Sequence, residues 1–151
     1  PRHARDSAQP SGNALAAEAL ARLAHRTGSD AARIKAESIF QAFAGDAARN
    51  AAALAGLLNA YDVLSGATQI TVIGRRGEAD TDALVAAAYS LPTASRVLQV
   101  VAPGAQLDSQ HPAVGKNAID GHATAYVCSG SVCAAPAADP GQLRVAWESL
   151  Q

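Results

Sequence analysis

The sequence predicts a mixed α and β fold in which helices come first and a small α/β unit follows. Three segments with helical periodicity occupy residues 11–65, and a β-branched run begins directly after Gly66. A strand, a helix and a second strand come next, and the chain closes with a hairpin and a helix. We therefore expect a helical segment of three helices over residues 1–66 and a small α/β subdomain over residues 67–151.

The first helix is predicted to begin at Ser11 or Asn13 and to end near Thr27-Gly28, after an irregular lead-in over residues 1–10. Ser and Asn are frequent N-cap residues, and Gly accepts the left-handed conformation that ends many helices. Apolar residues recur on one face at helical spacing, and they are Leu15, Ala19, Leu20 and Leu23.

Two further helices are predicted, one from Ser29-Asp30 to Gly45 and one from Ala47 or Asn50 to Ser65. Their apolar faces consist of Ile34, Ile39, Phe40 and Phe43, and of Leu54, Leu57, Leu58, Tyr61 and Leu64. Short Gly-bearing turns between the helices predict antiparallel packing. Because Ala dominates the apolar residues and only 4% of the chain is aromatic, we expect closely packed small side chains in the core.

In the second half, the segments 68–73 and 96–101 are predicted strands, and a helix begins at Asp80 or Thr81 between them and ends before Pro92. This order is typical of a βαβ unit with two parallel strands. Residues 103–121 are expected to form a loop. The segments 124–128 and 131–134 are predicted to form a hairpin, and Asp139-Pro140 begins the last helix with Gln142 as its capping-box partner.

Composition and charge exclude several classes of function. The net charge is −1 with acids and bases interspersed, which argues against binding nucleic acid. Apolar stretches are too short and interrupted to cross a membrane, and no secretory signal is visible, so we expect a cytoplasmic protein. The four histidines lie far apart, so neither a metal nor another cofactor is expected. The chain opens with Pro1 and has no Met, so we expect it to be part of a longer protein.

The two cysteines are the strongest candidates for chemistry. With Gly130-Ser131 at the tip of a two-residue turn of type II′, Cys128 faces Cys133 at a non-hydrogen-bonded position of the hairpin. Cα atoms there lie roughly 4.5 Å apart, within the range that a disulfide accepts. The pair is either redox-active or else structural or inert, for example as two small buried apolar residues in the reduced form. The spacing differs from the C-x-x-C of thioredoxin-type oxidoreductases.

Two other segments have alternative interpretations. The turn Gly74-Arg75-Arg76-Gly77 follows a strand and precedes a helix, so its amides and guanidinium groups suit a phosphate, although an ordinary βα turn explains it better. Ser11 and Asn13 either begin the first helix or, together with Tyr61, line a cavity and bind a ligand through their polar atoms. Motifs of serine hydrolases, zinc proteases and P-loop enzymes are absent from the sequence, so we expect no activity of this chain alone.

Two motifs resemble a known family. Ala8-Gln9-Pro10-Ser11-Gly12-Asn13-Ala14 resembles the PSGN segment of uncharacterised thioredoxin-domain proteins related to spermatogenesis-associated thioredoxin-like proteins. The closing motif of that family is similar to Gly115-Lys116, Asp120-Gly121, Thr124-Ala125-Tyr126-Val127-Cys128, Cys133, Ala135-Pro136 and Asp139-Pro140. The relatives usually carry bulky or charged residues between the two cysteines, whereas this chain has Ser129-Gly130-Ser131-Val132.

The resemblance implies a parent protein with an N-terminal thioredoxin-like domain and an (α/α)₆ barrel akin to those of glycosidases and sugar epimerases. This chain would then supply the last helices of the barrel and a C-terminal α/β appendage, with the remainder of the parent chain as its partner. Three functions follow: a structural C-terminal portion without a complete active site, a thiol-redox accessory role through Cys128 and Cys133, and part of a carbohydrate-binding or epimerase-like barrel. The isolated chain is also expected to self-associate, because a cut barrel exposes apolar helix faces.

Overall fold

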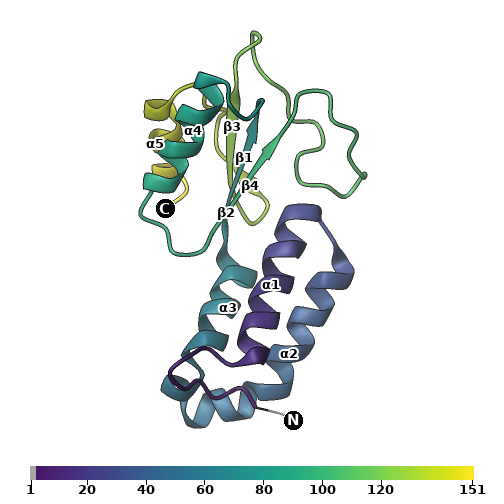
Figure 1. The fold of residues 1–151 in the computed structure, drawn as a ribbon, viewed down its shortest axis with the longest axis vertical. Helices are drawn as coiled ribbons and strands as arrows, with labels where there is room; N and C mark the ends of the chain where they lie inside the picture. The colour runs from purple at the N-terminus through teal and green to yellow at the C-terminus, as the bar shows by residue number, and fades with distance from the viewer. Residues whose placement is uncertain (1–2) are drawn as a thin grey trace. The chain divides into compact units, whose positions relative to one another are not determined.

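The computed structural model describes residues 3–151, and within them the chain is a mixed α/β protein with five α-helices and one mixed four-stranded sheet (Figure 1). The chain divides into two compact units. The first unit ends at Ala67, and the second unit is Thr68–Gln151. The first contains only helices and loops, and the second contains the sheet and two helices.

The helices of the first unit are α1 (Gly12–Thr27), α2 (Asp30–Arg49), the short 3₁₀ helix η1 (Ala51–Leu54) and α3 (Ala55–Gly66). Helix α1, which is purple in Figure 1, packs against α2, which is blue, and against α3, which is teal. The predicted N-caps are confirmed, because the Ser11 and Ser29 hydroxyls accept hydrogen bonds from the amides of Ala14 and Ala32.

The face of α1 that packs is lined by alanine, not by leucine. Four alanines at helical spacing are buried, namely Ala14, Ala17, Ala21 and Ala24. Leu15 and Leu23, which belong to the apolar face recognised in the sequence, are 53% and 48% exposed. Because a methyl side chain takes little space, it lets two helix backbones approach closely, and a leucine at the same position does not. The expected core of small side chains is thus present.

The prediction that Gly45 ends the second helix is wrong. Helix α2 continues to Arg49, and its C-cap is Asn50, whose side-chain oxygen accepts a hydrogen bond from the amide of Ala53 in η1. A glycine within a helix lowers its stability without necessarily ending it. The lead-in is held in place by Asp6, whose carboxylate accepts hydrogen bonds from the amides of Ser11 at 2.8 Å and Gly56 at 2.7 Å.

The second unit is built on a sheet with strand order β2-β1-β3-β4. Its strands are β1 (Thr68–Ile73), β2 (Arg96–Val101), β3 (Thr124–Ser129) and β4 (Val132–Cys133), and its helices are α4 (Ala79–Ser90) and α5 (Pro140–Glu148). Strand β1 pairs in parallel with β2 and antiparallel with β3. The predicted strands, the parallel pair and the hairpin are therefore confirmed.

The two faces of the sheet differ in what covers them. Ile70 and Val72 of β1 lie in the core beneath α4 and α5, together with Val127 of β3 and Leu84 and Leu143 of the two helices. Residues of β1 at odd numbers point to the opposite face because side chains alternate along a strand. On that opposite face, residues 102–117 fold back over the carboxyl ends of β1 and β2 and leave a pocket there.

Candidate functional site

The hairpin β3–β4 carries a disulfide between Cys128 and Cys133. Their Cα atoms are 4.0 Å apart, and the two residues are paired across the strands, one position beyond the pair Ser129–Val132 that closes the turn. Gly130 has a φ of 57°, and Ser131 is not among the residues with positive φ, which is the pattern of a type II′ turn. Local turn geometry thus brings the two sulfurs together, as the spacing predicts.

The two cysteines differ in exposure. Cys128 is buried on the sheet, whereas Cys133 lies on the edge strand β4 and is exposed. A thiolate from another protein reaches an exposed disulfide sulfur more readily than a buried one, because thiol–disulfide exchange requires direct approach to the sulfur. Cys133 is therefore the accessible end of this disulfide.

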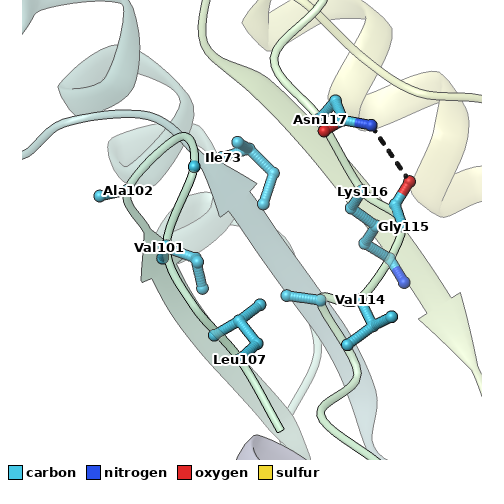
Figure 2. Close-up of a pocket in the computed structure, with 11 residues that line it drawn as sticks. Ile73, Val101, Ala102, Leu107, Val114, Gly115, Lys116 and Asn117 are labelled. Carbon is cyan, nitrogen blue, oxygen red and sulfur yellow. Dashed lines mark hydrogen bonds between the residues drawn. The ribbon is translucent and has the colours of Figure 1, made fainter. Parts of the chain in front are cut away.

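A pocket of about 270 Å³ lies at the carboxyl ends of the parallel strands β1 and β2 (Figure 2). Its wall is formed by Ile73 and Val101, the last residues of these two strands, and by Leu107 and Val114 from the loop that follows β2. In Figure 2 the side chains of Val101, Leu107 and Val114 gather around one space, with Lys116 and Asn117 at its border. The pocket therefore combines an apolar wall with a polar rim.

Lys116 is the cationic residue that lines this pocket. Its ammonium donates a hydrogen bond to the carbonyl of Pro112 at 2.6 Å and lies 5.8 Å from the centre of the Tyr126 ring. Within residues 3–151 the ion pairs do not include Lys116, so its charge has no carboxylate partner there. Burial lowers the pKa of the Lys116 ammonium, because removing water disfavours the charged form.

The loop is fixed beside the sheet by Tyr126 of β3. The Tyr126 hydroxyl donates to the carbonyl of Asn117 at 2.8 Å and accepts from the amide of the same residue at 3.2 Å. The sequence showed residues 103–121 as an irregular loop and Gly115-Lys116 as part of a family motif, but neither signal placed Lys116 beside the ends of β1 and β2.

The turn between β1 and α4 is explained by packing. A Cβ atom on Gly74 would lie 2.3 Å from the hydroxyl of Thr81, so only glycine fits. The amide of Gly77 donates to the carboxylate of Asp82 at 3.2 Å, and Arg75 lies 3.9 Å from the carboxylate of Glu78. These carboxylates engage one amide and one of the two guanidinium groups of the turn, which supports the interpretation as an ordinary βα turn.

Ser11, Asn13 and Tyr61 have different contacts in the structure. Ser11 is buried and caps α1, and the side-chain amide of Asn13 donates to the carbonyl of His3 at 2.7 Å. Tyr61 is half exposed and packs edge-on against Phe40, with 5.3 Å between ring centroids, in an apolar groove of about 390 Å³ between α2 and α3. Their role as ligand-binding residues stays a prediction.

Two ionisable groups, His25 and Asp80, have distant hydrogen-bond partners that the sequence did not predict. Burial lowers the pKa of His25, whose ring nitrogen Nε2 lies 2.8 Å from the carbonyl of Val63 and 3.1 Å from that of Leu64. Asp80 accepts a hydrogen bond from the amide of Ala123 at 2.8 Å, and this bond is the main reason why its pKa is lowered. Both groups connect segments far apart in the sequence.

Comparison with known proteins gives one informative similarity. The chain is 32% identical over 143 residues to human spermatogenesis-associated protein 20, and the matched region is 92% of this chain. The chain spans about 18% of the length of that curated relative. No family model matches the chain, and no solved structure matches it. The similarity over most of the chain suggests the family of spermatogenesis-associated protein 20, in agreement with the two sequence motifs.

Proposed function

We propose that this chain is the structural C-terminal portion of a larger thioredoxin-domain-type protein, with no complete active site of its own. Its antiparallel helices close the end of an (α/α)₆-type barrel, and its partner is the remainder of the parent chain, in the cytoplasm. The similarity supports this proposal because it extends over most of the chain but over a small part of the longer relative. No helix within residues 3–151 is long and apolar enough to cross a membrane.

The observation that carries the proposal is a second apolar face on α1. Leu15, Ala19 and Leu23 recur every four residues and are exposed, on a different face from the buried alanines. Large exposed apolar residues also occur on the two other helices, namely Ile34, Leu58 and Tyr61. A contiguous apolar helix face in contact with water favours packing against another helix. The further helices of a barrel would cover this face.

The test is the association state of the isolated chain, measured by light scattering over a range of concentrations. The proposal predicts concentration-dependent self-association, because the uncovered leucines of two copies bury each other. The double substitution Leu15→Gln with Leu23→Gln should yield a monomer. The matched control is Val132→Gln with Val145→Gln, which removes exposed apolar residues from the second unit and should leave self-association unchanged. A wild-type chain that is monomeric at every concentration contradicts the proposal.

A second candidate function, a thiol-redox accessory role, is favoured by the disulfide. On this proposal a thiolate of a thioredoxin-like domain attacks the sulfur of Cys133, the exposed residue of the pair, and Cys128 leaves as a thiolate. The second thiolate of the thioredoxin pair then attacks the mixed disulfide and releases Cys133. Two electrons pass from the thioredoxin dithiol, which becomes a disulfide, to this hairpin, which gains two thiols.

The redox proposal is tested by alkylating free thiols and measuring their number by mass spectrometry across a titration with reduced and oxidised glutathione. We expect both cysteines to change state together at a single midpoint. We also expect the oxidised wild-type chain to be trapped as a mixed disulfide on Cys133 by a bacterial thioredoxin whose second, resolving cysteine is replaced by serine. The control Ser129→Ala leaves both sulfurs in place and should titrate as the wild type does. Two cysteines that never change state exclude this role.

A further inference from the structure

The pocket at the carboxyl ends of β1 and β2 has the position of a ligand site. In sheets with parallel strands, ligands bind where the loops leave the carboxyl ends of the strands, because side chains and loop backbone diverge there. Here both Ile73 and Val101 end parallel strands, and the segment 102–117 closes over them. The residues that line the cavity do not include those of the disulfide hairpin.

The positive charge of Lys116 at the rim of the pocket favours a negatively charged ligand. Lys116 is partly buried, and its contacts are a neutral carbonyl and an aromatic ring. An ammonium has three N–H donors, and a partly buried cation without a counter-charge has lost hydration without gaining an ion pair. Within residues 3–151 no ion pair compensates it. An anionic group in the pocket would supply both the missing charge and further acceptors.

The apolar wall and the volume of the pocket limit the chemical class of the ligand. Ile73, Val101 and Leu107 present aliphatic groups, which suit a short hydrocarbon tail and do not suit a phosphate with four oxygens. A volume of about 270 Å³ lies just below the range of pockets for drug-sized ligands, so only a small molecule fits. We propose that this pocket binds a small organic carboxylate, with the carboxylate paired to Lys116 and the aliphatic tail against the ends of β1 and β2.

The proposal is tested on the full chain by titrating sodium 3-methylbutanoate into ¹⁵N-labelled protein and following amide shifts. The amides of Gly104 and Gly115, which line the pocket, should move and saturate. The neutral isostere 3-methylbutanamide and inorganic phosphate should each bind about tenfold more weakly or worse, because the first lacks charge and the second lacks a tail. Equal binding of the carboxylate and its amide, or of the carboxylate and phosphate, overturns the proposal.

The chain offers a matched control, because Lys35 and Lys116 are its two lysines. Lys116→Met should weaken binding of 3-methylbutanoate about tenfold or more, to the level of the amide, whereas Lys35→Met on exposed α2 should leave it unchanged. Lys35→Met also identifies the side-chain signals of Lys116, so the wild-type titration answers the question even if Lys116→Met does not fold. Lys116 signals that do not move as the pocket fills contradict the assignment.

Discussion

The two units of this chain use apolar residues in opposite ways. In the α/β unit the large aliphatic residues of the strands and helices are inside, as Ile70, Val72 and Leu84 illustrate. In the helical unit the contact face of α1 consists of alanines, while Leu15 and Leu23 on another face are exposed. The same rule that finds the core of the second unit therefore selects the wrong face of α1.

This difference between the units shows that hydrophobic periodicity predicts whether a segment is a helix or a strand. It does not predict which other helix or strand the segment packs against. A strand in a sheet has neighbours at a fixed distance of about 4.8 Å, and its large side chains fill the space above the sheet. Helices pack at distances that depend on the side chains between them, so small residues give close contact and large ones give a wider gap. A helix rich in Ala and Leu therefore has two faces suitable for packing, and an additional partner is needed to cover the second.

The substitution with the largest expected effect on the free energy of unfolding lies in the α/β unit. Leu84→Ala removes a fully buried side chain beneath the sheet, so it should lower the free energy of unfolding by about 2–5 kcal/mol. The matched control Val145→Ala truncates an exposed side chain on α5 and should change the free energy of unfolding by less than about 0.5 kcal/mol. Denaturant unfolding followed by circular dichroism measures both. Equal losses would mean that the core of this unit lies elsewhere.

The helical unit should respond most to an enlarged side chain. Ala17→Leu places three additional carbons in the close contact of α1, so it should cost about 1–3 kcal/mol in the same unfolding experiment. Ala16→Leu makes the identical change at the preceding residue, which is exposed, and should leave the free energy of unfolding nearly unchanged. If the two variants have the same stability, the alanine face is not a close contact.

Protonation of His25 should destabilise the helical unit. Burial is the main cause that lowers its pKa in the folded chain, with a smaller contribution from Arg33, while the carbonyls of Val63 and Leu64 oppose this shift. The folded chain therefore binds a proton less readily than the unfolded chain. The stabilisation is fully present above the ordinary value of 6.5 and is lost as pH falls from there through the folded-state pKa.

Thermal unfolding at about pH 7.5 and about pH 5 measures this effect. The wild type should lose more stability across this interval than His25→Gln, which cannot be protonated there. His3→Gln, at an exposed position, should keep the pH dependence of the wild type. A steep dependence that persists in His25→Gln would assign the effect to other groups.

The smallest effect on stability is expected on the exposed face of α1. Leu23→Ala should change the free energy of unfolding of the monomer by about 0.5 kcal/mol or less, because half of this side chain is already in water. The measurement requires a protein concentration at which the chain is monomeric. A loss comparable to that of Leu84→Ala would show that Leu23 is a core residue after all.

The sequence by itself determined the local elements. The side chains of caps such as Ser11 and Asp139 accept hydrogen bonds from amides three residues further along the chain, so a cap can be recognised from a few neighbouring residues. The register that pairs Cys128 with Cys133 follows from a two-residue turn, and β1 is recognised as a strand from its β-branched composition. Each of these depends on backbone geometry over a few residues.

Only the tertiary structure decided which faces are buried and which distant groups meet. Burial of the alanines of α1 depends on the helices opposite them, and the position of Lys116 beside Ile73 depends on how the segment 102–117 folds back over the sheet. The contact of His25 with the carbonyl of Val63 joins residues 38 positions apart. Such contacts depend on the free energy of packing the whole unit, and this free energy cannot be inferred from a short stretch of sequence.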